Sequence, residues 1–232
     1  MKLGNRIESG EFLERPNRYL ARVKVNGEEV LAHVPDPGRL PGLMIPGREV
    51  RLIYNPSPQR KTSYTLALIR HENIWVSVYP VFANKIMGEA FAENKIDCLG
   101  DYKSFKAEAK IGKSRFDFRL EFENDLVGYV EVKSVSLVEA GTGKFPDAPT
   151  ERGRKHLREL IELKGKGFRS SVIFVSQRSD TQKIIPNVDI DPEFAKVLRE
   201  AQQAGVKLYG YNCRVTADSV ALNQRVEVST DY

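Results

Sequence analysis

Short runs of alternating apolar and polar residues fill the first 80 residues of the chain. The segments RYLARVKV and EEVLAHV flank Asn26-Gly27, a dipeptide typical of two-residue hairpin turns. REVRLIY, TLALIRH and IWVSVYP have the same texture, and the Pro- and Gly-rich stretch PDPGRLPGLMIPG interrupts the series. These five strands predict a small closed β-barrel of the OB type over residues 1–80, which fits the spacing better than an SH3-like barrel.

The pattern changes at Val81. FANKIMGEAFAENKI has helical spacing, and three strand-like runs follow it closely: FKAEAKI, SRFDFRLEF and LVGYVEVKSVSL. TERGRKHLRELIELKGKG then predicts a helix with Thr150 as its N-cap, followed by the strand SSVIFVSQ, the helix DPEFAKVLREAQQAG and the strand VKLYGYNCRVT. The order α-β-β-β-α-β-α-β predicts an α/β domain with a mixed sheet over residues 81–232.

Composition narrows the classes of function. The hydrophobic fraction of 41% and charged fraction of 29% are typical of a soluble globular protein, and no apolar run is long enough to span a bilayer. The N-terminus shows no signal-peptide pattern, and Cys98 and Cys213 match neither a CxxC motif nor a disulfide framework, so we expect a cytoplasmic protein. The net charge is +5, with most of the surplus in the first 80 residues. That distribution suits a polyanionic partner, and it equally suits an ordinary basic surface.

An acid and a base stand two residues apart in the predicted strand VGYVEVKSVSL. Glu131 and Lys133 therefore project from the same face of the strand. The preceding strand carries a lone acid, Asp117, within RFDFRL, and an antiparallel turn near residues 124–125 would bring it within reach of Glu131. Two carboxylates on rigid strands suit Mg²⁺ or Mn²⁺, and a lysine beside them suits the charge that develops on a scissile phosphate.

The predicted site assigns roles to five residues. Asp117, Glu131 and Lys133 are the candidate catalytic residues, and Asp117 and Glu131 are also candidate metal ligands. Glu108 on the first strand or Glu89 on the preceding helix would complete the metal shell. The alternative is a salt-bridged sheet face, in which Glu131 and Lys133 pair with cross-strand neighbours and no metal binds.

The element order and the triplet resemble the core of the PD-(D/E)xK nucleases, with α-β-β-β-α-β over residues 81–176. The literal Pro146-Asp147 pair follows the Glu-x-Lys motif, whereas the family's aspartate precedes it. The acid that corresponds to that aspartate is therefore Asp117, which Phe116 precedes here. The resemblance implies either a metal-dependent hydrolase of phosphodiester bonds or a descendant that only binds nucleic acid.

Four segments spread from residue 33 to residue 206 resemble the sugar fermentation stimulation protein family: HVPDPGRLPGLMIPG, YVEVKSVSL, FPDAPTERGRKHLREL and EAQQAGV. The resemblance implies an OB-like N-terminal domain joined to a PD-(D/E)xK-like domain. It also implies DNA as a partner and an association with the regulation of sugar catabolism. Family members often carry Asn at the position of Asp36.

Basic residues supply candidate DNA contacts in both predicted domains. Arg152 and His156 share a helix face at i and i+4, and with Lys155 they suit a phosphate near the helix N-terminus. The barrel candidates are Arg22, Lys24, Arg39, Arg60 and Lys61 for phosphates, and Tyr19, Tyr54 and Tyr64 for base stacking. Each of these residues also suits a plain surface or core role.

Three hypotheses about function stay open. The first is a DNA-binding, metal-dependent nuclease, and the second is a catalytically silent DNA-binding regulator. The third is a module that binds a sugar or another protein, since OB barrels also bind oligosaccharides. Steep salt dependence would separate the first two from the third. A homodimer is compatible with the sequence, and nothing in the pattern argues for it.

Overall fold

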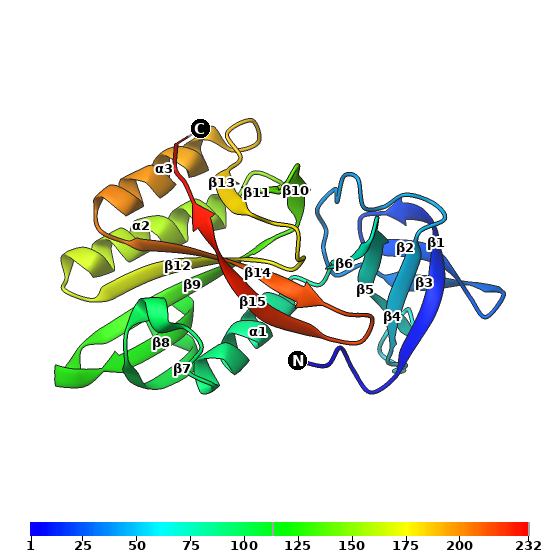
Figure 1. The fold of residues 1–232 in the computed structure, drawn as a ribbon, viewed down its shortest axis with the longest axis horizontal. Helices are drawn as coiled ribbons and strands as arrows, with labels where there is room; N and C mark the ends of the chain where they lie inside the picture. The colour runs from blue at the N-terminus through cyan, green and yellow to red at the C-terminus, as the bar shows by residue number, and fades with distance from the viewer. Residues whose placement is uncertain (113, 232) are drawn as a thin grey trace.

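The chain folds into two lobes that lie side by side in Figure 1, a β-barrel and a larger layered α/β region. The computed structural model describes residues 1–112 and 114–231. The architecture confirms the predicted fold class, an OB-like barrel followed by a nuclease-like α/β domain with a mixed sheet. No helix in the described part of the chain is long and apolar enough to cross a membrane.

The barrel is closed by different strands from those predicted. The bounds are β1 (Ile7–Asn17), β2 (Leu20–Val25), β3 (Glu28–His33), β4 (Glu49–Tyr54), β5 (Tyr64–His71) and β6 (Ile74–Ser77). The ring runs β3-β2-β1-β4-β5, and parallel pairing of β3 with β5 closes it. The predicted set omitted β1 and included β6, which extends the sheet beyond β5. The sequence of β1, IESGEFLERPN, is mostly polar, and Phe12 alone is buried within it, so its periodicity is weak.

The predicted hairpin turn at Asn26-Gly27 joins β2 to β3. Both residues have positive φ, 50° at Asn26 and 88° at Gly27, as a type I′ turn requires. The Pro- and Gly-rich stretch between β3 and β4 forms neither helix nor strand, as predicted. It nevertheless sends Leu40 and Leu43 into the barrel core, where they pack with Phe12.

The larger region is built on a sheet in the order β10-β11-β13-β15-β14-β12-β9-β8-β7. The strand bounds are β7 (Tyr102–Ile111), β8 (Ser114–Phe122), β9 (Val127–Val135), β10 (Leu137–Glu139), β11 (Thr142–Phe145), β12 (Arg169–Ser176), β13 (Lys183–Pro186), β14 (Lys207–Val215) and β15 (Val220–Val228). β7, β8 and β9 are antiparallel neighbours, whereas β9, β12 and β14 run parallel. The prediction missed β10, β11, β13 and β15. The first three are too short to show a period.

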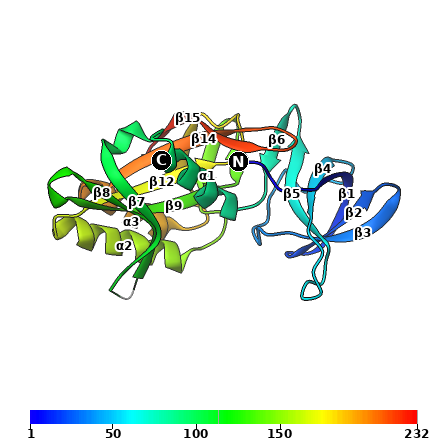
Figure 2. The same cartoon turned by 90° about the horizontal axis from the view of Figure 1, so that it is seen from below.

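Helices cover both faces of this sheet (Figure 2). They are α1 (Val81–Ala92), α2 (Glu151–Gly165) and α3 (Pro192–Gln203), all predicted from sequence. The predicted N-cap of α2 is confirmed, because the Thr150 side chain accepts a hydrogen bond from the Gly153 N–H. Asp191 caps α3 in the same way and accepts from the Phe194 N–H. One apolar cluster packs under α1 and a second under α2 and α3.

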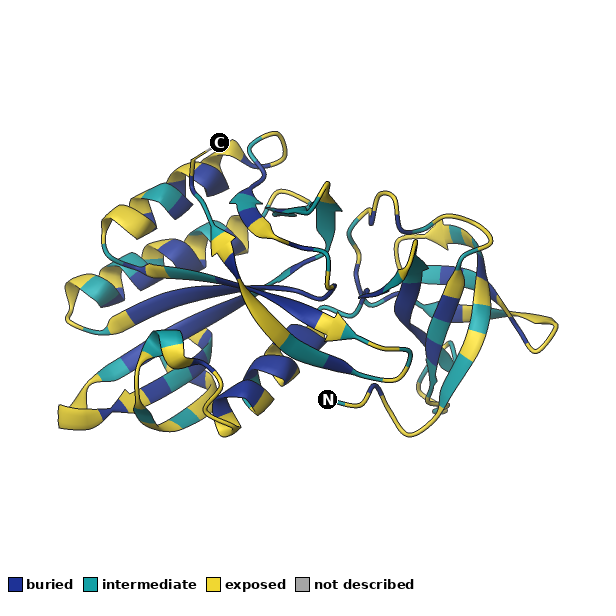
Figure 3. Cartoon of the chain, viewed as in Figure 1, coloured by how far each residue is buried: buried dark blue, intermediate teal, exposed yellow. Residues whose placement is uncertain are grey.

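Burial is continuous along the central strands and along the inner sides of the helices (Figure 3). Leu3 joins the cluster under α1, and the Met1 amino group donates to the Val220 carbonyl at 2.7 Å. The first residues of the chain therefore pack against the larger region, before the chain enters the barrel at β1.

Candidate metal and nucleic-acid site

Asp117 on β8 is fixed by two hydrogen bonds, one to each carboxylate oxygen. The register pairs Phe118 with Val130, which carries Asp117 towards Glu131 on β9. Asp117 Oδ2 accepts from the Val132 N–H at 2.7 Å, and Oδ1 accepts from Asn84 Nδ2 at 2.7 Å. The acid therefore lies between β9 and the first turns of α1, in one orientation.

Glu131 lies buried beside it, with only 4% of its surface exposed. Its Oε1 accepts from Lys133 Nζ at 2.6 Å and hydrogen-bonds His156 Nδ1 on α2. Its Oε2 is also buried and has no hydrogen-bond partner among the described residues. An unpartnered carboxylate oxygen is costly inside a protein, so this atom is suited to a ligand that the protein itself does not supply.

The pKa values of the two carboxyls are shifted in opposite directions. Burial disfavours the charged form of Glu131, but the His156 hydrogen bond and the Lys133 ammonium outweigh it, so its pKa lies below the ordinary value. Burial and the neighbouring Glu131 raise the pKa of Asp117, despite the bonds from Val132 and Asn84. A divalent cation would favour both charged forms, because it would replace the repulsion between them with attraction.

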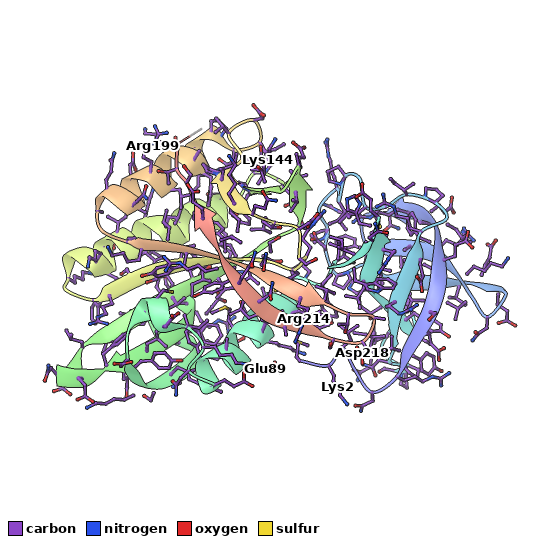
Figure 4. All side chains as sticks on the ribbon, in the orientation of Figure 1. Lys2, Glu89, Lys144, Arg199, Arg214 and Asp218 are labelled. Atoms are coloured by element: carbon purple, nitrogen blue, oxygen red, sulfur yellow. The ribbon has the colours of Figure 1, made fainter. Side chains whose placement is uncertain are left out.

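The predicted acids Glu89 and Glu108 are not drawn into this cluster. Glu89 Oε2 pairs with the Met1 amino group at 2.8 Å, and Figure 4 shows it on α1 near the N-terminal segment that carries Lys2. Glu108 is exposed and pairs with Arg115 at 3.2 Å. Across the residues that the structure describes, no group of three or more His, Cys, Asp or Glu side chains is arranged to hold a metal. The protein's own carboxylate ligands would therefore be Asp117 and Glu131, and water or phosphate would complete the shell.

His156 departs from its predicted position as a surface phosphate contact. It is 7% exposed and reaches inward to Glu131, because α2 turns Gly153, His156, Leu157 and Leu160 towards the sheet. Arg152 and Lys155 stay exposed on the outer side, as predicted. Helical spacing placed Arg152 and His156 near each other on α2, but it could not show that the sheet covers His156 and leaves Arg152 exposed.

A groove of about 850 Å³ runs along α2, and it is named the basic groove because four Arg or Lys side chains line it beside three Glu side chains. Its walls are the start of β8 and the outer side of α2, which lie beside each other in Figure 2. The lining residues are Ser114, Arg115, Glu151, Arg152, Lys155, His156, Arg158, Glu159 and Glu162. His156 lines the groove and also hydrogen-bonds Glu131, whereas Asp117, Glu131 and Lys133 are not among the lining residues.

Asn84 is a site residue that the sequence did not reveal. It lies on the same side of α1 as Gly88, where a Cβ would approach the Phe118 ring at 3.8 Å. That close approach of helix and sheet brings the Asn84 amide to Asp117. A lone asparagine in a helical pattern carries no signal of such a role, since only the tertiary packing gives it a partner.

The barrel candidates divide into three groups. Tyr19, Arg60 and Lys61 line one shallow groove of about 450 Å³. Arg22 is paired with Glu14 at 2.8 Å, and Lys24 and Arg39 are exposed elsewhere on the barrel. The ring centroids of Tyr54 and Tyr64 lie 5.1 Å apart in a tilted arrangement, and the Arg6 guanidinium lies 4.2 Å from the Tyr54 ring centroid, so both rings contact other protein groups.

The fold and the site together define a class, an OB-like barrel joined to a nuclease-like domain with an acid pair and a lysine on neighbouring strands. Two family models match the chain: the SfsA N-terminal OB domain over residues 13–78 and the sugar fermentation stimulation protein RE domain over residues 81–219. The chain belongs to the sugar fermentation stimulation protein family.

Full-length relatives support this assignment. A sugar fermentation stimulation protein homolog from Clostridium botulinum (strain Loch Maree) is 42% identical over 98% of this chain and 99% of its own length. A homolog from Clostridium perfringens (strain SM101) is 40% identical over the same shares. Among solved structures, Pyrococcus furiosus SfsA in complex with Ca²⁺ superposes with a TM-score of 0.85, at 27% identity and over 99% of both chains.

Proposed function

We propose that this protein binds DNA and that Asp117 and Glu131 hold a Mg²⁺ or Mn²⁺ ion used to hydrolyse phosphodiester bonds. The observation that carries the proposal is the buried Oε2 of Glu131, which has no partner among the described residues although the carboxyl favours its charged form. Carboxylate oxygens are the ligands that these cations prefer. The related P. furiosus protein is described in complex with Ca²⁺, another oxygen-binding cation, which supports the choice of ligand chemistry.

The bound ion would supply an activated water and offset charge on the phosphate. The chain's own groups have separate roles in this proposal. His156 holds Glu131 in one orientation, and Asn84 does the same for Asp117. Lys133, 12% exposed at its side chain, places a positive charge where a phosphate in the site would meet it. Arg152 and Lys155 would hold the DNA backbone along the groove beside α2.

Cleavage of labelled single-stranded, duplex and branched DNA tests the proposal most simply. We expect products with Mn²⁺ or Mg²⁺, none with EDTA, and none from a Lys133→Ala variant. Glu200→Gln, an exposed acid on α3, serves as the control and should cut like the wild type. Metal-independent products, or equal cutting by Lys133→Ala, would contradict the assignment of the site.

A second function, DNA binding without cleavage, is favoured by one feature. Lys133 and His156 both use the same oxygen of Glu131, so the lysine is already engaged with a carboxylate. Salt-sensitive binding with no cutting on any substrate would select this alternative. Absence of binding even at low salt would reject both functions in favour of a sugar- or protein-binding module.

A further inference from the structure

A second cavity, of about 220 Å³, lies at the end of the sheet where β9, β12 and β14 begin. Figure 1 shows these three parallel strands starting on the side of the domain away from the barrel. The cavity includes Val130 near the start of β9, whereas Lys133 lies closer to that strand's far end. The cavity is therefore separate from the basic groove beside α2, and the two share no lining residue.

The strand register explains why the cavity has an apolar floor. Paired residues on neighbouring strands project from one face, so the pairs Leu120–Gly128 and Val130–Ser171 present their side chains together. Phe122 lies over Gly128, where a Cβ would come within 2.9 Å of its ring, so only glycine fits there. The 3-10 helix η1 (Asp97–Leu99) contributes Leu99 to the wall.

Three cations surround this floor. Lys164 at the end of α2, Arg169 at the start of β12 and Lys207 at the start of β14 all line the cavity. No acidic residue of the described chain lines it, and none of the ion pairs between described residues involves these three cations. The Arg169 guanidinium lies 4.1 Å from the Phe122 ring centroid and gives one N–H to the Leu99 carbonyl, which leaves its other donors available.

Hydroxyl groups lie in the same wall. Ser171 is buried, at 5% exposure, lines the cavity and pairs with Val130, so its side chain lies on the same face as the floor. Its neighbour Ser170 pairs with Tyr129 and projects from the opposite face of the sheet. Tyr209 also lines the cavity, and its hydroxyl donates to the Cys98 carbonyl. Cations without ion-pair partners beside an apolar floor are the setting of an anion site with an apolar neighbour.

We propose that this cavity binds a small organic anion that has a flat apolar body of about one ring and a single carboxylate, sulfate or phosphate group. The apolar body would lie against Leu120, Phe122 and Val130, and the anionic group would face Arg169 and Lys207. The volume excludes a nucleic-acid duplex. The cavity shares no residue with the carboxylate site, so this inference does not depend on the proposed DNA chemistry.

Phenyl phosphate is a suitable probe, with inorganic phosphate and phenol as its two halves. The full chain would be titrated in EDTA and followed by amide chemical shifts and by calorimetry. We expect saturable binding of phenyl phosphate, with the shifts centred on residues 128–130 and 169–171, and at least about tenfold weaker binding of either half. Absence of saturation up to ~10 mM would overturn the proposal. Equal binding of inorganic phosphate, or shifts confined to the groove beside α2, would also overturn it.

A matched pair of variants locates the charge. Lys207→Gln removes an exposed cation at the cavity and should weaken phenyl phosphate binding about three- to tenfold without affecting folding. Lys183→Gln removes an equally exposed lysine on β13, outside the cavity, and should leave binding unchanged. If both variants bind phenyl phosphate with the same affinity, the anion does not contact Lys207, and the assignment of this cavity is contradicted.

Discussion

Two pairs of acids in the described part of the chain, Asp117 with Glu131 and Asp36 with Asp147, each have one buried and one half-buried member, and the pairs differ in what faces them. In the larger domain, Glu131 has Lys133 and His156 beside it, and its pKa lies below the ordinary value. At the contact between the lobes, Asp36 from the barrel faces Asp147 from the loop after β11. There, burial raises the pKa of Asp36 to about 6, with a further contribution from Asp147.

The geometry of the second pair is set by Gly38. A Cβ at Gly38 would come within 1.9 Å of Asp147 Oδ2 and 2.9 Å of Asp36 Oδ1, so the two oxygens converge on the space left by the missing side chain. Arg15 lies beside them but donates to the backbone carbonyls of Asp36 and Gly38. Asp147 Oδ2 is buried and finds no hydrogen-bond partner in the described structure.

The contrast separates two uses of a buried acid. Glu131, which has basic partners, stays charged at neutral pH and suits a cation. Asp36 and Asp147 hold their protons more tightly, as Asp117 does, but neither of them has a charged carboxyl such as Glu131 beside it. Burial alone therefore does not identify a metal site. The groups that face the acid decide whether it suits a cation. The following changes alter the acids, one partner of Glu131 and the groove beside α2.

The largest expected effect is on cleavage by Glu131→Gln. The amide keeps the volume of the side chain but removes the charge, so we expect cleavage to fall at least about 100-fold. DNA binding through Arg152, Lys155 and the barrel should persist. Cleavage rates and binding in parallel measure this, and retained cleavage would show that Glu131 has no part in the chemistry.

His156→Ala should have the next largest effect. Loss of the ring releases Glu131 Oε1 and removes one cause of its lowered pKa, so we expect Mn²⁺ affinity to fall about 10- to 100-fold. The loss should be greatest at low pH, where Glu131 would now take up a proton more readily. Mn²⁺ titration between pH 5 and pH 8 measures this loss of affinity. Lys155→Ala, a change at the exposed neighbouring residue, serves as the control. If His156→Ala binds Mn²⁺ as the wild type does, the histidine does not position the carboxylate.

Asp36→Asn should stabilise the protein at neutral pH. The raised pKa means that the folded state binds more protons than the unfolded state between about pH 4 and pH 6. Stability from this group is therefore present below the unfolded pKa and is lost as the pH rises through about 6. Asparagine cannot ionise, so we expect a gain of about 1–3 kcal/mol at pH 7 and a flatter stability curve. Urea unfolding at pH 4.5 and pH 7 measures it, and a loss of stability at pH 7 would contradict the account.

The smallest expected effect concerns the basic groove. Replacing both Arg152 and Lys155 with Gln should leave Mn²⁺ binding unchanged and weaken DNA binding several-fold at low salt. Each lost phosphate contact should also reduce the slope of log affinity against log salt by about 1. An unchanged slope would place the DNA outside this groove.

Sequence patterns predicted the helices, the barrel class and the meeting of Asp117, Glu131 and Lys133, because periodicity and antiparallel register are local properties. They failed for β1, whose polar sequence is held in the ring by its neighbours β2 and β4. They also assigned Glu89 to the metal shell, because the pattern could not show that the N-terminal amino group reaches its carboxylate.

The acid pair between the lobes could not be predicted. Both residues were noted separately in the sequence. Asp36 stands where the family often has Asn, and Asp147 belongs to the Pro-Asp pair that follows the Glu-x-Lys motif. Their contact depends on how the two lobes pack, which no local pattern specifies. The same holds for Asn84 and for the inward side of His156, since both acquire their partners from other elements.

Mn²⁺ titration of three proteins tests the central claim directly: the wild type, Glu131→Gln and Asp147→Asn. The account predicts one ion bound by the wild type and by Asp147→Asn, and none by Glu131→Gln. Loss of the ion in Asp147→Asn with retention in Glu131→Gln would contradict it, and would move the cation to the acids between the lobes.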